Sequence, residues 1–349
     1  MKLYNFDFSK KIFYHPEKIV EYKQGKRPFP TSLEIDLTNI CNHRCDFCFH
    51  AEHRAKDKSS LDTDLIKKRI KETCELGTKG ISFTGGGEPM IHKDFIGIME
   101  YTHSLGLHIG LITNGSLINE DNASKMIKCL TWIRISMGGG DKESYHKVQG
   151  VNQFERVIKN IKILSDTKTK EKSSLNIGIR VLVTKENLQS LANLTNIIKD
   201  FNINYLQVAP DQFTNDCGKF WNDQKTKEVF SQVEKIISKK GIMLLTAGYM
   251  MFQDNLDHPR TCYAHFFHSA IIAEGYLLFC KNARDKEKYY VGNITKKTLK
   301  EIWNSEHVKK LESYIKPYNC GLFCKNLALN IAMEDSLHPA LDVSFNFVG

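Results

Sequence analysis

Three cysteines stand close together near the start of the chain, in the run Cys41-Asn-His-Arg-Cys45-Asp-Phe-Cys48. Thiolates are soft ligands that suit iron–sulfur clusters or zinc. Three of them from one tight loop can hold three irons of a cubane cluster and leave the fourth iron open. Structural zinc normally takes four protein ligands, and no fourth cysteine follows within the next twenty residues. The spacing therefore favours an iron–sulfur cluster, with a zinc loop completed by His43 or His50 as the alternative.

A glycine-rich run, Thr84-Gly-Gly-Gly-Glu88-Pro89, follows the cysteines after one expected helix and one expected strand. Glycines let a ligand approach the backbone without obstruction by side chains, and a carboxylate beside them can accept hydrogen bonds from an ammonium group. A glycine triplet by itself is also an ordinary turn. The cysteine triplet, with the aromatic Phe47 before its last cysteine, and this second motif together resemble the radical S-adenosylmethionine (SAM) enzymes.

The resemblance implies a SAM-binding 4Fe-4S cluster on Cys41, Cys45 and Cys48, with Phe47 beside it. An electron from the cluster cleaves SAM, and the resulting 5′-deoxyadenosyl radical abstracts a hydrogen atom from the substrate, while the protein positions and shields the cofactor. A flavodoxin- or ferredoxin-type protein is the expected reductant.

The resemblance also implies which other residues contact SAM. The amino group is assigned to the glycine-rich run, the ribose and the carboxylate to the ends of the third and fourth strands, and a carboxylate anchor to a basic residue further on. Lys147 is the candidate for this basic anchor, and a solvated loop lysine is the alternative. Arg180 either faces the barrel interior and binds an anion or points outward. The residues are Gly86, Gly87, Glu88, Asn114, Ser136, Lys147 and Arg180.

A second group of cysteines lies in the last third of the chain, and one member follows a Glu-Gly turn signal for a hairpin. These four resemble the twitch form of the C-terminal extension of radical SAM enzymes, which carries one auxiliary 4Fe-4S cluster. The fuller SPASM form needs three more cysteines. A structural zinc on the same four thiolates is the alternative. The four are Cys262, Cys280, Cys320 and Cys324.

Cys217 stands apart from both groups, in a stretch that follows the sixth expected strand. A thiol at that place could give a hydrogen atom to a substrate radical, which makes Cys217 the candidate catalytic residue. An ordinary loop cysteine is the alternative. Cys74 and Cys129 sit among apolar helix positions, which is typical of buried cysteines.

Between residues 31 and 210 the sequence alternates short apolar strands with helices. Such alternation predicts right-handed parallel crossovers, and six units resemble the partial (β/α)6 barrel of the family, with chemistry at the carboxyl ends of the strands. We expect a lead-in at 1–30, the barrel at 31–240, and a small α+β twitch domain with a hairpin and helices at 241–349. The lysine-rich run at 168–172 is expected to be a loop, and 299–315 one helix.

Composition limits the class of protein. The chain of 349 residues is 41% hydrophobic and 26% charged, which is ordinary for a soluble globular protein. No apolar run approaches the roughly 18 residues of a membrane span, and no signal-peptide core opens the chain, so a cytoplasmic protein without a membrane partner is expected. The charge of +9 comes from dispersed lysines, which favours an anionic small substrate over nucleic acid.

These features predict a radical SAM oxidoreductase or epimerase. The lead-in is too short to be an independent domain that grips a peptide, so we expect a small-molecule substrate: a sugar, aminosugar or nucleotide sugar, epimerised or dehydrogenated. The alternatives are radical SAM modification of a peptide and, outside enzymes, a zinc-bearing binding protein. Barrels of this kind support many chemistries, so the substrate stays open.

Overall fold

The computed structural model describes residues 10–210, 217–246, 261–284, 286–316, 324 and 326–338. Its strands form one ten-stranded sheet in the order β10-β9-β8-β1-β2-β3-β4-β5-β6-β7. The pairs from β8 through β1 to β7 are all parallel, and β9 and β10 join as antiparallel strands. The prediction of a partial parallel barrel followed by a small α+β unit is confirmed.

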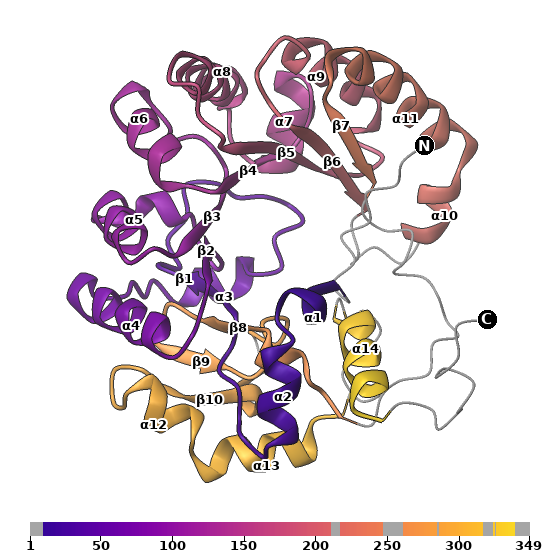
Figure 1. The fold of residues 1–349 in the computed structure, drawn as a ribbon. Coiled ribbons are helices and arrows are strands. Elements are labelled where there is room, and N and C mark those ends of the chain that lie inside the picture. The colour runs from indigo at the N-terminus through magenta and orange to yellow at the C-terminus, as the bar shows by residue number, and fades with distance from the viewer. Residues whose placement is uncertain are drawn as a thin grey trace.

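The strands bend into an open arc, and the helices that connect them lie along its outer side (Figure 1). The strands are β1 (Ser32–Asp36), β2 (Gly80–Thr84), β3 (His108–Thr113), β4 (Trp132–Met137), β5 (Asn176–Val183), β6 (Tyr205–Pro210), β7 (Met243–Thr246), β8 (His268–Ile271), β9 (Tyr276–Leu278) and β10 (Tyr290–Asn293).

The helices of the barrel are α4 (Thr63–Glu75), α5 (Phe95–Ser104), α6 (Glu120–Cys129), α7 (Lys142–Gln149), α8 (Phe154–Lys170), α9 (Leu191–Ile198), α10 (Cys217–Asn222) and α11 (Gln224–Ile237). The remaining helices are α1 (Lys11–Tyr14), α2 (Glu17–Lys23), α3 (Ala51–Lys56), α12 (Leu299–Trp303), α13 (Glu306–Tyr314) and α14 (Leu327–Leu337).

Alternation along the strands decides which side chains face the barrel interior. In β4 the residues Ile133, Ile135 and Met137 are buried, on the face that the outer helices cover. Successive side chains of a strand point to opposite faces, so Arg134 and Ser136 face the interior. The same rule places Arg180 of β5 in the interior, because it pairs with Ser136. The interior is therefore polar, and the core lies between the sheet and its helices.

Three details of the fold differ from expectation. The run at 168–172 is not a loop, because α8 continues to Lys170. Lys168 is buried there and donates to Asn204 Oδ1 at 2.7 Å, ahead of β6, which holds the last turn in place. The helix expected at 299–315 is two helices, α12 and α13, separated at Asn304 and Ser305. The helix α7 was not expected at all.

The C-terminal hairpin is part of the barrel sheet. β8 pairs in parallel with β1, from Ser32 with His268 to Ile35 with Ile271, and the expected Glu274-Gly275 turn then leads into β9. On the other side, β7 pairs with β6 beyond residue 240. The domain boundary at 240 stays a prediction.

The N-terminal segment is fixed to the C-terminal helices by an ion pair. Arg27 donates through Nε and Nη2 to the two carboxylate oxygens of Glu312, at 2.8 and 2.7 Å, and His265 Nε2 lies 3.1 Å from the same carboxylate. Burial alone would raise the pKa of Glu312, but the hydrogen bonds from His265 and Arg27 outweigh it and lower the pKa to about 2. A bidentate pair of this kind is among the stronger charged contacts.

Replacing Glu312 with Gln should lower the free energy of unfolding by about 1–2 kcal/mol at pH 7, a value discounted for the partial exposure of the pair. The folded-state pKa of Glu312 lies below its unfolded value, so the contribution is present above about pH 4.5 and is lost as the pH falls toward 2. Urea unfolding of metal-free protein at pH 7, 5 and 3.5 measures this difference. Glu155→Gln, in an exposed pair with Lys142, is the control, and an equal effect of both variants would contradict the assignment.

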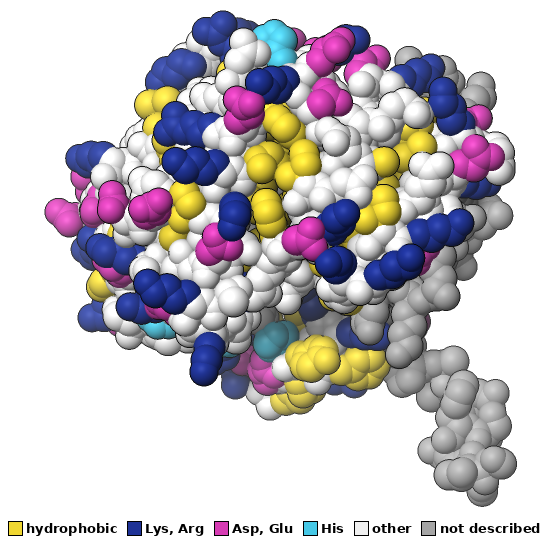
Figure 2. Space-filling model, turned by 90° about the horizontal axis from the view of Figure 1, so that it is seen from above, with side chains coloured by type: hydrophobic (Ala, Val, Ile, Leu, Met, Phe, Trp, Pro, Cys, Tyr) yellow, Lys and Arg dark blue, Asp and Glu magenta, His cyan; other side chains and the backbone are white. Residues whose placement is uncertain are grey.

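On the face drawn in Figure 2, lysine and arginine side chains are interspersed with acidic ones over the described surface. No helix among the described residues is long and apolar enough to cross a membrane.

Candidate active site

The cysteine triplet lies directly beyond the carboxyl end of β1. Cys41, Cys45 and Cys48 are all half-buried. Burial and, to a smaller extent, the charges of Cys48 and Cys41 raise the pKa of Cys45 to about 12, which means that the three thiols are close enough to interact. A buried group of thiols is disfavoured as thiolates unless a cation or metal compensates. The structure thus brings together the three residues that the sequence assigned to one cluster.

The glycine-rich run packs against the start of this loop. Gly87 N donates to Thr38 O and Glu88 N to Ile40 O, both at 2.9 Å. A Cβ atom on Gly86 would lie 2.2 Å from Asn39 Oδ1, and one on Gly87 would lie 2.2 Å from Ile40 O. These glycines are therefore needed for close approach to the protein's own chain, whereas the sequence had suggested close approach to a ligand.

The carboxylate of Glu88 is held at the carboxyl end of β3. Its Oε1 accepts from Thr113 Oγ1 and its Oε2 from the backbone N of Asn114, both at 2.7 Å. Glu88 is buried, and burial raises the pKa of its carboxyl although these hydrogen bonds oppose the rise. A buried carboxylate fixed in this way can accept hydrogen bonds from an ammonium group with little further ordering.

Asn114 connects the end of β3 to the cysteine loop. Its Nδ2 donates to Asn42 Oδ1, and Asn42 Nδ2 in turn donates to Ser116 Oγ, each at 2.8 Å. The amide side chain of Asn114 is thus occupied within the protein, where it orients the residue next to Cys41. This is a positioning contact that the sequence did not reveal.

The helix α7 supplies two further contacts that sequence reasoning missed. Tyr145 Oη lies 2.9 Å from His43 Nε2, and the thiol of Cys45 donates to Gln149 Oε1 at 2.5 Å. Gln149 Nε2 also donates to Ser136 O at 3.1 Å. The available signal was the helical spacing of the apolar residues Tyr145 and Val148. A short helix that is not followed by a strand is easily interpreted as a loop. Both ring nitrogens of His43 are hydrogen-bonded, which weakens the zinc alternative that used His43.

Arg54 of α3 lies close enough to this loop for its charge to act on Cys41. It is 9% exposed, and it lowers the pKa of the Cys41 thiol against the larger effect of burial. Its Nε is buried and has no hydrogen-bond partner among the described residues. A buried guanidinium beside three thiols fits an anionic cluster at this position, so the residues present are compatible with the expected metal group.

The other predicted SAM contacts are placed differently from one another. Ser136 lies at the carboxyl end of β4, beside Gln149, and Phe47 is half-buried in the cysteine loop. Lys147 is exposed on α7, outside the buried face that contacts the loop, and its charge lowers the pKa of Glu186 after hydrogen bonds that matter more. The structure therefore brings Ser136 to the site and leaves Lys147 at the surface. All these assignments stay predictions.

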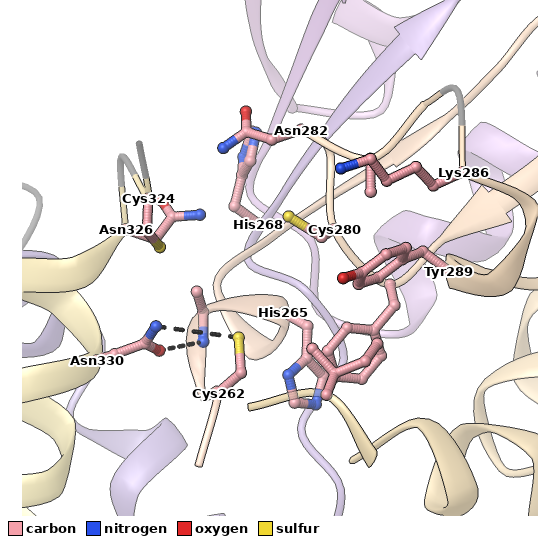
Figure 3. A pocket seen from close by; sticks show the side chains of 14 residues that line it. Cys262, His265, His268, Cys280, Asn282, Lys286, Tyr289, Cys324, Asn326 and Asn330 are labelled. Carbon is pink, nitrogen blue, oxygen red and sulfur yellow. Dashed lines mark hydrogen bonds between the residues drawn. The ribbon is translucent and has the colours of Figure 1, made fainter. Parts of the chain in front are cut away.

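Three of the late cysteines line one cavity of about 60 Å³, shown in Figure 3. Cys262 precedes β8, Cys280 follows β9, and Cys324 precedes α14. Asn330 Oδ1 accepts from the backbone N of Tyr263 and Ala264, at 2.8 and 2.9 Å, which fixes the Cys262 segment to α14. Cys320, the fourth member, lies outside the described residues. The convergence of three thiols from separate elements fits a thiolate-ligated metal group.

A buried charge network joins this cavity to the barrel. Arg284 lies four residues after Cys280 and donates to Asp36 Oδ2 at 2.9 Å and to Glu34 Oε2 at 2.8 Å, and both acceptors belong to β1. Lys281 Nζ donates to Glu34 Oε1 at 3.0 Å. Burial would raise the pKa of Glu34, but Lys281, His268 and Arg284 hold it well below its usual value. The strand that delivers the first cysteine loop is thus bonded to the loop that carries Cys280.

Cys217 is the first residue of α10 and not a loop residue. The chain that joins it to β6 and the side chain of Cys217 lie outside what the structure describes, so its catalytic role stays a prediction.

Comparison with known proteins gives the same division of the chain. Residues 35–198 match the model of the Radical SAM superfamily, and residues 262–326 match SPASM, an iron–sulfur cluster-binding domain. The second match contains all four late cysteines.

Three relatives illustrate the range of the similarity. A probable GTP 3′,8-cyclase of Saccharolobus islandicus is 26% identical over 60% of this chain and 67% of its own length. The cofactor-modifying protein of the tungsten-containing aldehyde ferredoxin oxidoreductase of Pyrococcus furiosus is 25% identical over 78% of this chain and 81% of its own. The crystal structure of Streptococcus suis SuiB bound to the precursor peptide SuiA superimposes with a TM-score of 0.66, 17% identity, and coverage of 92% of this chain and 75% of that one.

The two matched domains imply 4Fe-4S clusters and SAM as cofactors. With this fold, this pair of cysteine sites and these matches, the chain belongs to the radical SAM superfamily and carries a C-terminal iron–sulfur cluster-binding domain.

Proposed function

We propose that this radical SAM enzyme abstracts a hydrogen atom from a small molecule, a sugar, aminosugar or nucleotide sugar, and that the reaction ends in epimerisation or dehydrogenation. The observation that carries hydrogen abstraction is the convergence of Cys41, Cys45 and Cys48 with Glu88 and Asn114 at the carboxyl ends of β1 to β3. When bound there, the cluster and SAM supply a carbon-centred radical that can remove hydrogen from an unactivated carbon.

The chain's own residues bind and orient the reacting groups. Cys41, Cys45 and Cys48 would hold the first cluster, while Glu88 would accept hydrogen bonds from the amino group of SAM. Gln149 connects Cys45 to the end of β4 through Ser136 O. The second cluster would be held by Cys262, Cys280, Cys320 and Cys324.

The two outcomes differ in what happens to the substrate radical. In dehydrogenation the radical would lose one proton to water and one electron to a one-electron acceptor, a role that an iron–sulfur cluster held by the late cysteines would supply. In epimerisation Cys217 gives the radical a hydrogen atom on the opposite face, so that the S–H bond breaks and a C–H bond forms. The thiyl radical left on Cys217 would become a thiol again by taking one proton from water and one electron from a one-electron donor, a role that an iron–sulfur cluster held by the late cysteines would supply.

A peptide substrate is the second candidate, because SuiB, which shares the fold over nearly the whole described chain, was crystallised with its precursor peptide. Formation of 5′-deoxyadenosine separates the two. Reduced, anaerobic enzyme with SAM should form it several-fold faster with a nucleotide sugar or sugar phosphate from a panel. Acceleration by cysteine- or glycine-containing peptides alone would overturn the small-molecule proposal.

In deuterated water, an epimerised product should carry one deuterium at the inverted carbon, because the Cys217 thiol exchanges with solvent. Cys217→Ala should abolish that product, whereas Cys74→Ala, which removes a half-buried helix thiol, should not. A product two mass units lighter, formed equally well by Cys217→Ala, would reject epimerisation and establish dehydrogenation. Mass spectrometry of the product measures both.

A further inference from the structure

Two arginines project into the barrel interior side by side. Arg134 of β4 pairs with Gly178 of β5, and Arg180 pairs with Ser136, so the two arginines are diagonal neighbours on one face of adjacent strands. Such neighbours lie within reach of long side chains. The charge of Arg134 lowers the pKa of Arg180, in addition to a larger effect of burial, which agrees with their proximity.

Among the described residues, no ion pair joins either arginine to an acidic side chain, although the charge of Glu34 raises the pKa of Arg134 against the larger effect of burial. The Nε atoms of both are buried and have no hydrogen-bond partner among the described residues. Within the described part of the chain, the guanidinium of Arg134 makes a long contact, 3.4 Å from Nη1 to Gln207 Oε1. The two carboxylates of β1 that face the same interior, Glu34 and Asp36, are already bonded to Lys281 and Arg284. The pair therefore carries positive charge that no directly bonded carboxylate among the described residues compensates, in a largely buried place.

Aromatic rings pack on the amino-end side of the two arginines. A Cβ on Gly110 would lie 2.2 Å from the ring of Trp132, and one on Gly178 would lie 2.0 Å from the ring of Tyr205. These two rings fill the interior toward the amino ends of the strands. Arg134 and Arg180 are further along β4 and β5, toward the carboxyl ends where the cysteine loop lies, and both side chains keep partial exposure.

We propose that Arg134 and Arg180, with Gln207 beside them, form an oxyanion-binding subsite that anchors a phosphate or carboxylate group of the substrate inside the barrel. Unpaired buried cations are costly to maintain, and guanidinium groups bind both kinds of oxyanion with two parallel hydrogen bonds. The inference rests on the proposed function, because it gives the reacting small molecule its point of attachment.

Arginine-specific labelling of the reconstituted, SAM-saturated enzyme tests the subsite directly. Phenylglyoxal should modify Arg134 and Arg180, and pyrophosphate or citrate should protect both without protecting the exposed Arg156 of α8. Protection by pyrophosphate assigns a phosphate group, and protection by citrate alone assigns a carboxylate. If neither probe protects the arginines, the proposal fails, because no anion binds there. It also fails if SAM alone already protects both arginines and the probes add nothing, because the bound anion is then the carboxylate of SAM.

Variants supply a second readout. Arg134→Gln and Arg180→Gln should each weaken binding of the protecting probe about tenfold to a hundredfold, the loss expected for a charged hydrogen bond, and Arg156→Gln should leave it unchanged. Arg180→Met should raise the melting temperature by about 1–4 °C, because an unpaired cation is removed. A lower melting temperature with unchanged probe binding would show a structural role and reject the subsite.

The two proposals can fail separately. If no small molecule accelerates 5′-deoxyadenosine formation but the probe still protects both arginines, the proposed function fails and the subsite stands. If small molecules accelerate 5′-deoxyadenosine formation and the probe protects neither arginine, the proposed function stands and the subsite fails.

Discussion

Replacing Cys41, Cys45 and Cys48 together with alanine should halve the iron content of the anaerobically reconstituted protein, from about eight to about four atoms per chain, and abolish formation of 5′-deoxyadenosine. The three thiols lie together on one loop and supply all the protein ligands that we assign to the first cluster. Iron analysis and chromatography of the SAM-cleavage products measure the two effects. The remaining iron should be held by the late cysteines.

Variants of the other cysteines serve as comparisons for the triple variant. Cys262→Ala with Cys280→Ala should remove the other half of the iron and stop product formation, yet preserve reductive SAM cleavage. Cys74→Ala and Cys129→Ala change thiols outside both groups and should keep all the iron. Parental rates of 5′-deoxyadenosine formation in the triple variant would remove the basis for the first cluster site. A content of about one zinc and about four irons per chain would show that the late cysteines hold a structural zinc and not an auxiliary cluster.

Arg284→Leu should destabilise the protein by about 3–5 kcal/mol, because it leaves the buried carboxylates Glu34 and Asp36 with too little positive charge. Asp36 is only 1% exposed, and burial already raises the pKa of its carboxyl although Arg284 opposes the rise. Without Arg284 that pKa should rise further. Urea unfolding at pH 7 measures the loss, and iron analysis should show that both cluster sites are affected.

Compensating substitutions separate the charge effect from lost packing. Adding Glu34→Gln and Asp36→Asn to Arg284→Leu should restore much of the stability, because the uncompensated charges are removed along with their partner. Arg284→Lys keeps the charge but loses the bidentate contact, so an intermediate effect is expected. If Arg284→Leu alone were as stable as the parent, water would have to solvate the two carboxylates, and the charge network would contribute little to stability.

The sequence predicted the order and type of nearly all barrel elements, for physical reasons that particular strands illustrate. In β4, apolar and polar residues alternate from Ile133 to Met137, and Asp62 and Asn119 are side-chain caps at the starts of α4 and α6. Such signals are local and can be read without the fold. The two cysteine groups were equally readable, because their spacing is short or their flanking turns are distinctive.

What could not be predicted depends on contacts between distant residues. The pairing of Arg134 with Arg180 requires the register of β4 and β5, and the bond from Cys45 to Gln149 crosses 104 positions. Arg284 meets Glu34 and Asp36 across about 250 positions. A single amino-acid sequence, read without aligned relatives, does not reveal which polar residues meet across such separations. The positioning residues were therefore missed even where the cysteine ligands were found.

The pairing of β8 with β1 has a consequence for synthesis of the protein on the ribosome. Ser32 of β1 pairs with His268 in a chain of 349 residues, so more than three quarters of the chain must emerge before this edge of β1 gains its neighbour. An unpaired parallel strand edge with an apolar face is prone to associate with other chains. Nascent chains that stall or end near residue 246 should therefore aggregate or recruit chaperones, whereas full-length chains should not. Ribosome-bound chains of increasing length, tested for solubility after release, should become soluble only once residues 268–271 have left the exit tunnel.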